Sequence, residues 1–274
     1  AIVREPCISF AVFAFEEAVI LRQAGIRNEI LIFSRIQKHW LEPASRLNLV
    51  VSASSMDDLK LLQDVHVLTG RCPRFHIKFD TGMTRLGFDL AESDSVFELL
   101  NTKKSLPIEG IYSHFASSED GDLIYAHNQL NAFKQVVKEG QDADLSFQYI
   151  HRSNSGAVLT LSQASFNLVR VGMLLYGAFP SEDVPMDMPI KPVMEFKGPV
   201  VALREVSAGT KVSYGGVWEA PQDTIIGVIK TGFADGFPRS WYMDGYVGLR
   251  GKYYPIAGRV CRDQLMVDFG KANV

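Results

Sequence analysis

Residues 78–87, with the sequence KFDTGMTRLG, bring a lysine, an aspartate and an arginine together around a glycine-containing turn. The apolar residues Phe75 and Ile77 come before this segment and predict a buried strand that leads into it. Charged side chains at the carboxyl end of a strand in a parallel sheet or barrel point toward the place where ligands bind. The segment is therefore a candidate site; the alternative is a strand-to-helix loop whose charges are solvated.

A second candidate is the segment His151–Gly156, which follows a predicted strand at 147–150 and precedes a predicted helix at 157–161. Hydroxyl residues and a glycine at a helix N-terminus form a ready anion site, because free N–H groups and the helix dipole both favour phosphate. From these residues alone, an ordinary helix cap at Ser155 without any ligand is the favoured alternative.

A third candidate is Arg170, which lies in a predicted apolar strand at 168–171 ahead of Gly172. An arginine is almost never buried unless it is paired, so this position requires an acceptor. A structural salt bridge would supply one. The neighbouring candidate phosphate site favours a functional role, in which Arg170 offers a fixed cation beside it.

The elements that position these residues alternate between strands and helices in the first part of the chain. Strands are predicted at 8–12, 30–33, 49–51, 75–79, 108–113, 147–150 and 168–171, and helices at 15–24, 56–63, 93–100 and 122–139. This alternation predicts parallel strands joined by right-handed crossovers, as in a TIM-like α/β barrel or an open doubly wound sheet. No G-x-G-x-x-G motif follows a strand, which disfavours a dinucleotide-binding sheet.

The composition changes at residues 180–192, where a polar stretch with four prolines indicates a linker. Beyond it the sequence predicts strands at 199–205, 224–229, 246–249 and 265–269, separated by glycine-rich turns. We therefore predict an α/β barrel domain over residues 1–187 and a mostly β domain over residues 188–274.

Composition narrows the class of function. The chain has 274 residues, a formal net charge of -3 and no apolar run long enough to cross a bilayer, so neither nucleic acid nor a membrane is an expected partner. Cys7, Cys72 and Cys261 form no C-x-x-C pair, and the histidines show no ligand spacing. We expect a cytoplasmic protein without a metal site that acts on a small molecule.

Taken together, the motifs resemble those of the alanine racemases. They occur in the family's order and span Lys78 to Asp263: K-x-D-T-G-M-x-R-x-G from Lys78, Ser113–Ala116, His151-x-x-Asn154-Ser155, Val169-Arg170-x-Gly172, Val212–Gly215, Gly232–Gly236 and Gly258–Asp263. The resemblance implies pyridoxal phosphate bound to a TIM-like barrel, racemisation of L- and D-alanine for bacterial peptidoglycan, and a head-to-tail homodimer.

The resemblance also implies roles for the residues that handle the proton. Tyr214 matches the tyrosine that removes or returns the α-proton on the L-alanine face, acting on the partner subunit's cofactor. An unperturbed phenol titrates near ~10 and needs help for this task, and His114 matches the histidine that tunes it. Arg170 matches the arginine that faces the cofactor's pyridine nitrogen. Because a guanidinium only donates, that nitrogen should stay an acceptor, which suppresses side reactions.

Other residues match the binding sites of the family. Ser155, Gly172 and Met173 match the phosphate cradle, with Asn154 beside them. Arg85 matches an arginine that contacts the cofactor's ring oxygen and the substrate carboxylate. The remaining matches are Lys78, which is carbamylated in many relatives and then holds that arginine, and Arg262 and Asp263, which lie on the loop that reaches the partner's site.

Four departures from the family pattern leave alternatives open. The lysine that binds the cofactor and serves as second base lies in a motif upstream of Ala1, and a phosphate-binding tyrosine would lie beyond Val274, so we expect a fragment truncated at both ends. Phe233 stands in place of a common tyrosine, and Arg262 in place of a common methionine. The alternatives are a non-catalytic fragment, a broad-specificity racemase, or a decarboxylase of this fold, which Arg170 disfavours.

Overall fold

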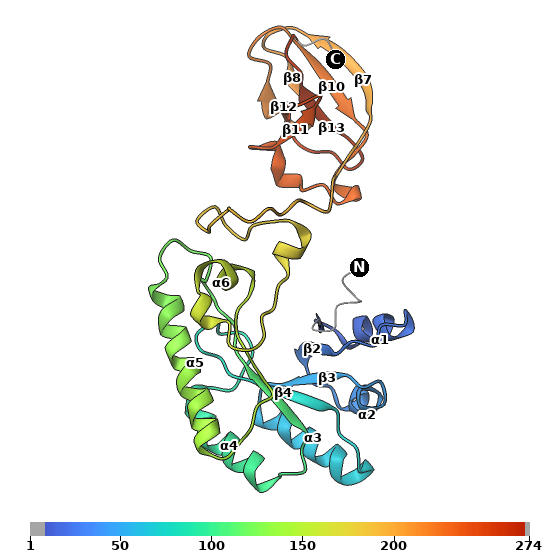
Figure 1. Ribbon diagram of the computed structural model, residues 1–274. Helices are drawn as coiled ribbons and strands as arrows, with labels where there is room; N and C mark the ends of the chain where they lie inside the picture. Colours follow the sequence, from blue (N-terminus) through green and yellow to red (C-terminus); the bar gives the residue numbers. More distant parts are fainter. Residues whose placement is uncertain (1–8, 272–274) are drawn as a thin grey trace. The chain divides into compact units, whose positions relative to one another are not determined.

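A curled parallel sheet forms the centre of the first part of the chain, in a computed structural model that describes residues 9–271 (Figure 1). Its six strands pair in sequential order: β1 (Phe10–Val12), β2 (Ile30–Arg35), β3 (Val50–Ala53), β4 (Arg74–Lys78), β5 (Ile108–Tyr112) and β6 (Tyr149–His151). A doubly wound sheet reverses its strand order at a switch point, whereas a barrel keeps it. The sheet is therefore part of a TIM-like barrel, and the open-sheet alternative is wrong.

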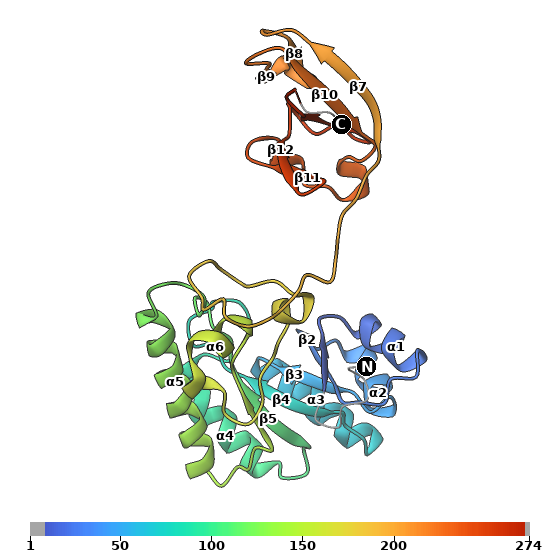
Figure 2. The same cartoon turned by 45° about the horizontal axis from the view of Figure 1, so that its top comes forward.

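Six α-helices connect or follow these strands: α1 (Phe15–Gln23), α2 (Lys38–Arg46), α3 (Met56–Thr69), α4 (Ser93–Thr102), α5 (Ile124–Asp142) and α6 (Ser155–Thr160). Figure 2 shows α3, α4 and α5 along the outer side of the sheet. Between sheet and helices lies a core that includes the fully buried Ile32, Val51, Phe75, Ile77 and Ile111. Burying each large apolar side chain contributes about 1.5–3 kcal/mol, so this core fixes the strands that carry the site.

Two elements of the first part of the chain differ from the predictions, and residues 211–212, 218–219 and 252–255 of the second part form strands that were not predicted. Helix α2 was not predicted, because Pro43 lies inside it; Trp40, Leu41 and Ala44 are nevertheless buried on one of its faces. The strand predicted at 168–171 is wrong. Only Leu168 forms a bridge, to His151, and the short 3-10 helix η4 (Met173–Tyr176) begins directly after Gly172 and turns the chain away.

The contacts divide the chain into two units between Val193 and Met194, and the predicted boundary after residue 187 stays a prediction. The second unit is mostly β, as predicted. Its largest sheet has the antiparallel order β13 (Leu265–Asp268), β10 (Thr224–Ile229), β7 (Val200–Val206), and two smaller pairs are β11 (Tyr246–Leu249) with β12 (Lys252–Pro255) and β8 (Lys211–Val212) with β9 (Trp218–Glu219). Val260, Val267 and Phe269 belong to its separate core.

Residue 8 of the first predicted strand and Cys7 lie outside the described residues. Within residues 9–271, no helix is both long and apolar enough to span a bilayer.

Candidate functional site

The barrel part of the site lies where three neighbouring strands end. The register pairs Lys78 on β4 with Tyr112 on β5, and Tyr112 with His151 on β6, so these three side chains form one row across the sheet. Parallel strands bring their carboxyl ends to one edge, where the loops that follow can build a site together. The three candidate segments predicted from the sequence do meet at this edge.

The turn after β4 is organised by Asp80. Its carboxylate accepts backbone N–H groups from Gly82 at 2.8 Å, Met83 at 2.8 Å and Arg85 at 3.0 Å. Burial alone would raise the pKa of Asp80, but these backbone donors outweigh it and lower the pKa below its usual value. The carboxylate therefore fixes the loop, and the exposed Arg85 side chain is left free for a ligand.

Lys78 is a buried amine in a field of positive charge, with only 6% of its surface exposed. Burial, and then the charges of Arg85 and Arg170, lower its pKa to about 8, against an opposing effect of Asp80. Among the described residues it forms no ion pair with a carboxylate. A lysine with this pKa is partly neutral near physiological pH and can act as a nucleophile.

Arg170 is held by uncharged acceptors. Its Nη2 donates to the carbonyl oxygens of Ser113 at 2.7 Å and Arg152 at 2.9 Å, and it lies 3.1 Å from His114 Nδ1. Its Nη1 lies 2.7 Å from His151 Nδ1. Burial lowers the pKa of Arg170 to about 10, so it stays charged at neutral pH. The salt bridge considered from the sequence is absent among residues 9–271.

His114 is neutral in this setting. Burial, followed by the charges of Arg170, Arg85 and Lys78, lowers its pKa to about 3. Because a guanidinium has only donors, the His114 Nδ1 that lies 3.1 Å from Arg170 Nη2 carries no proton, and the proton of the imidazole lies on Nε2. His114 therefore has one N–H donor left for a further group.

Asn154 and Ser155 start helix α6, and Asn154 is its cap, rather than Ser155 as considered from the sequence. The Asn154 side chain accepts the N–H of Ala157 at 2.9 Å and the hydroxyl of Ser118 at 2.7 Å. The Ser155 hydroxyl instead accepts the N–H of Gly172 at 3.1 Å, which joins the start of α6 to the start of η4. The first N–H groups of both helices have no partner inside the helix.

The donor set of this edge fits a dianionic phosphate and a carboxylate. Lys78, Arg85, Arg152 and Arg170 form no ion pair in the described part of the chain. A Cβ built on Gly172 would meet no atom within 4 Å, so the space in front of the Ser155–Gly172 contact is open. Excess cations and helix N–H groups around an open space are the features that bind anions in proteins.

In the second unit the loops of three motifs are joined to one another. The Ser213 hydroxyl donates to the carbonyl of Arg259 at 2.6 Å, and the N–H of Ala234 donates to the carbonyl of Arg262 at 2.9 Å. Ser213 has φ +66°, which turns the chain so that Tyr214 is 68% exposed. The side chains of Arg262 and Asp263 are exposed as well. Tyr214, Arg262 and Asp263 therefore belong to one loop cluster of this unit.

Arg152 supports the site from behind, and the sequence analysis did not single it out. It is fully buried, and its guanidinium donates to the carbonyl of Gln129 and to Thr81 Oγ1, both at 2.8 Å, over the ring of Phe115. Burial and the charge of Arg170 lower its pKa to about 9. An arginine directly after a buried strand was the available signal.

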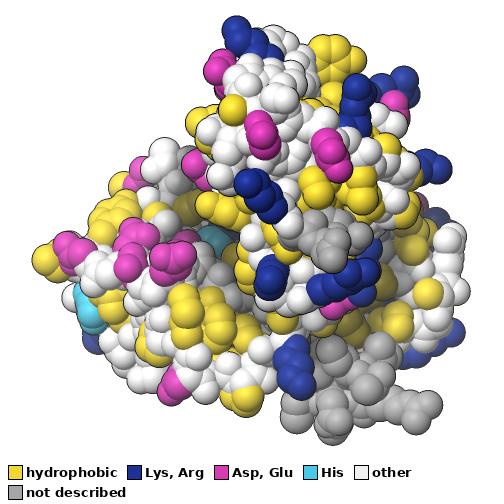
Figure 3. Space-filling view, turned by 90° about the horizontal axis from the view of Figure 1, so that it is seen from above, with side chains coloured by type: hydrophobic (Ala, Val, Ile, Leu, Met, Phe, Trp, Pro, Cys, Tyr) yellow, Lys and Arg dark blue, Asp and Glu magenta, His cyan; other side chains and the backbone are white. Residues whose placement is uncertain are grey.

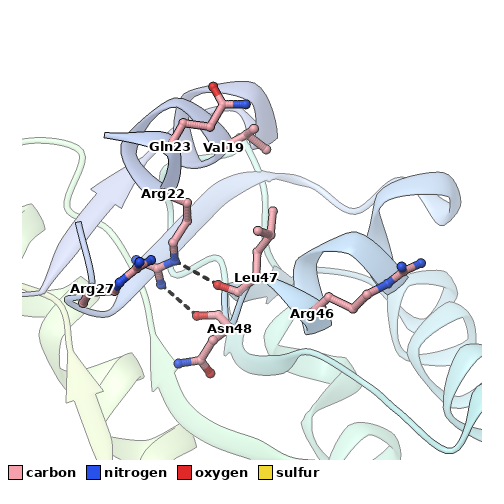
Figure 4. Close-up of a pocket in the computed structure, with 7 residues that line it drawn as sticks. All are labelled: Val19, Arg22, Gln23, Arg27, Arg46, Leu47 and Asn48. Carbon is pink, nitrogen blue, oxygen red and sulfur yellow. Dashed lines mark hydrogen bonds between the residues drawn. The ribbon is translucent and has the colours of Figure 1, made fainter. Parts of the chain in front are cut away.

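A cavity of about 400 Å³ in the first unit is lined by Arg22, Arg27, Arg46 and Asn48, among other residues (Figure 4). It lies at the amino ends of β2 and β3, the edge opposite to the site. The Arg22 guanidinium donates to four backbone carbonyls, those of Leu47, Ile26, Asn28 and Asn48. Arg22 thus ties loops together, as expected for the stability face of a barrel.

Comparisons with known proteins agree on one family. Residues 2–180 match the alanine racemase N-terminal domain, and residues 193–274 match the alanine racemase C-terminal domain. Alanine racemase 2 of Caldanaerobacter subterraneus subsp. tengcongensis is 36% identical over 94% of this chain and 67% of its own length. The alanine racemase of Carboxydothermus hydrogenoformans is 35% identical over 97% of this chain and 73% of its own length.

Solved structures show the same likeness. The alanine racemase of D-cycloserine producing Streptomyces lavendulae superposes with a TM-score of 0.88 at 29% identity, covering 96% of this chain and 70% of that one. The alanine racemase of Bartonella henselae, with covalently bound pyridoxal phosphate, superposes with a TM-score of 0.86 at 26% identity, covering 98% and 73%.

Proposed function

The chain belongs to the alanine racemase family, whose members interconvert L- and D-alanine, and we propose that it does so with pyridoxal phosphate bound at the carboxyl edge of the barrel. The observation that carries this proposal is the cluster of cations and helix N–H groups without carboxylate partners. The D-alanine would serve bacterial peptidoglycan, and we place the reaction in the cytoplasm.

Different residues at this edge would bind different parts of the cofactor. Ser155 and Met173 would hold its phosphate through a hydroxyl and an N–H group, and Gly172 would join them by turning its N–H from Ser155 Oγ to the phosphate. Asn154 would cap the helix behind them, and Arg170 would face its pyridine nitrogen. When bound, pyridoxal phosphate withdraws electrons from the substrate's Cα and so acidifies the α-proton. Arg170 would donate to the ring nitrogen without protonating it, which would limit this withdrawal and restrain side reactions.

Arg85 and Lys78 act together on the substrate carboxylate. The partly neutral Lys78 amine attacks carbon dioxide: a new N–C bond forms, one proton leaves to water, and a carbamate anion results. The carbamate would place a negative charge where the buried Lys78 ammonium was. This negative charge would form an ion pair with Arg85. Arg85 is thereby oriented toward the carboxylate, while Arg262 and Asp263 come from the partner's loop cluster. Phe233 and Arg262 are the positions that would widen the range of substrates.

Tyr214 moves the α-proton on the L-alanine face. Its phenolic oxygen accepts the proton, and the Nε2–H of His114 stabilises the phenolate that must form. Tyr214 acts on the partner subunit's barrel in a homodimer. Exposed apolar side chains on β7 support such an assembly, since Val200, Val201 and Leu203 are 38%, 50% and 49% exposed. Figure 3 shows other hydrophobic side chains at the surface of one face.

The test is exchange of the α-hydrogen in deuterated water. The family's lysine base has no match within residues 1–274, so the test uses the protein expressed from its full natural sequence. Loaded with pyridoxal phosphate, it should place deuterium at Cα of both alanine enantiomers, and D-alanine should appear from L-alanine on a chiral column. Cofactor that remains after desalting without any exchange would support a non-catalytic binding protein instead. Exchange with larger or acidic amino acids at equal rates would support the broad-specificity racemase.

A further inference from the structure

Two imidazoles lie behind Arg170 and take no part in the proposed function. His151, at the end of β6, is 0% exposed, and His76, on β4 two residues before Lys78, is 3% exposed. His151 Nδ1 lies 2.7 Å from Arg170 Nη1, and His151 Nε2 lies 2.9 Å from His76 Nδ1. The three side chains thus form a buried chain of hydrogen bonds that ends at the site.

Arg170 fixes the direction in which the hydrogen bonds are donated along these three side chains. Arg170 can only donate, so His151 Nδ1 must accept and carries no proton. The proton of His151 therefore lies on Nε2 and is donated to His76 Nδ1. His76 in turn keeps its own proton on Nε2, a buried atom that has no hydrogen-bond partner within residues 9–271. Both rings must be neutral, because a doubly protonated imidazole in either place would set two donors against each other.

The packing holds both rings in place. The His151 ring stacks on the Tyr112 ring with centroids 4.7 Å apart and an interplanar angle of 4°. The Tyr112 hydroxyl donates to Ser52 Oγ at 2.8 Å, and Ser52 donates to the carbonyl of Ile32 at 2.7 Å. The His76 ring lies over Gly110, where an added Cβ would come within 2.9 Å of it. One ring is therefore packed on an aromatic ring and the other on the backbone of a neighbouring strand.

The electrostatic surroundings agree with neutral rings. Burial, and then the charges of Arg74 and Arg170, lower the pKa of His76 to about 3. Burial, Arg170 and His76 lower the pKa of His151 well below its usual range. Both imidazoles therefore stay neutral at every pH at which the enzyme would work.

We propose that His76 is a positioning residue: its Nδ1 lone pair accepts the Nε2–H of His151 and so stabilises the tautomer that Arg170 requires, and His151 thereby holds the Arg170 guanidinium at the angle needed to donate to the ligand. Without an acceptor at position 76, the Nε2–H of His151 would be buried and unpaired. The other tautomer would then become competitive, and it would place a donor 2.7 Å from the Arg170 donor. This inference rests on the proposed function of Arg170.

The first test reads the tautomer without cofactor. In protein labelled with 15N at histidine, we expect the His151 signals to show a proton on Nε2 and none on Nδ1. His76→Asn keeps an acceptor oxygen near the place of Nδ1 and should retain this pattern, whereas His76→Leu should lose it. A proton on Nδ1 of His151 in the unaltered protein would overturn the proposal, even if neither variant folds.

The second test uses the loaded enzyme. We expect His76→Leu to lower kcat on the order of 10- to 100-fold with a smaller change in KM, because misplacing a fixed group by a fraction of an ångström costs this much, and His76→Asn to restore most of it. Equal kcat in a folded His76→Leu variant would refute the positioning role. Failure of the loaded protein to racemise at all would refute the proposed function and leave the tautomer test standing.

Discussion

Lys78 shows how a side chain's surroundings set its chemistry. On a surface the amine would be fully charged, but here burial and two arginines lower its pKa from 10.5 to about 8. The same surroundings make Arg170 and His114 complementary, one always a donor and the other a neutral acceptor. At the residue scale, the site is therefore defined by charge and by the direction of hydrogen bonds.

The pKa of Lys78 predicts a pH-dependent effect on stability. Between pH 8 and 10.5 the unfolded chain binds more protons than the folded one, so the free energy of unfolding rises with pH over this window. In buffer free of carbon dioxide, we expect Lys78→Met to raise the free energy of unfolding at pH 7 by up to about 3 kcal/mol. This gain in the free energy of unfolding should shrink as the pH approaches the pKa of a free lysine.

Urea unfolding at several pH values measures this effect. Lys134→Met is the matched control, because Lys134 is exposed on α5 and has no comparable burial. A gain from Lys78→Met that is the same at every pH, or equal to that of the control, would contradict the assignment of a depressed pKa to this lysine.

A substitution at Tyr214 should change the rate of the reaction without changing the stability of the protein. Because its side chain is 68% exposed, we expect Tyr214→Phe to leave the melting temperature unchanged. Loss of an acid-base group should slow exchange of the α-proton of L-alanine by about 10²- to 10⁴-fold. Tyr253→Phe, at a position 80% exposed in the same unit, should change neither quantity. Undiminished exchange in Tyr214→Phe would rule out the proposed base.

At the scale of elements, the barrel strands bring the site residues to one edge of the sheet, and the turns after the strands fix the positions of their side chains. The turn after β4 depends on Gly82, whose φ of +124° is unfavourable for other residues. A Cβ there would also collide with the Tyr125 hydroxyl, which donates to the carbonyl of Gly82 at 2.6 Å. This hydrogen bond joins helix α5 to the turn that carries Arg85.

We therefore expect Gly82→Ala to cost more stability than an ordinary glycine replacement. Gly25 is the matched control, since its φ is +85° but a Cβ there would meet no atom within 4 Å. Gly25→Ala should lower the free energy of unfolding by about 1 kcal/mol, and Gly82→Ala by roughly 2 kcal/mol, because the Tyr125 hydroxyl must also move and give up its hydrogen bond to the Gly82 carbonyl. Equal losses in denaturant titrations would show that Tyr125 does not restrict this turn.

At the scale of the whole molecule, the candidate residues fall into two sets, one on the barrel edge and one on a loop cluster of the second unit. Each set alone lacks part of the proposed chemistry: the barrel has Arg170 and His114, and the second unit has Tyr214. An isologous dimer can bring each barrel to the partner's second unit.

Complementation between inactive variants tests this assembly. Tyr214→Phe and Arg170→Gln should each be inactive alone. When the two are co-expressed, every mixed dimer should contain one intact site, so we expect about a quarter of the normal activity for random pairing. Purification through two different tags should enrich it. No activity in purified mixed dimers would show that Tyr214 does not act on the partner's site.

The sequence by itself determined the family, the order of its motifs and most of the elements, because alternation of apolar strands and helices is a local property. The strands at 224–229 and 246–249 were predicted at their observed bounds. Local signals misled where a proline lay inside α2 and where an apolar segment at 168–171 had only one residue in reach of the sheet edge.

Only the tertiary structure decided what surrounds each site residue. His76 and His151 are 75 residues apart in the sequence, and nothing in their local patterns indicates a contact. The same holds for the absence of an ion pair at Arg170 within the described range, and for the buried Arg152. Tautomers, depressed pKa values and the direction of a hydrogen bond depend on which groups share a low-dielectric space, and folding alone brings those groups together.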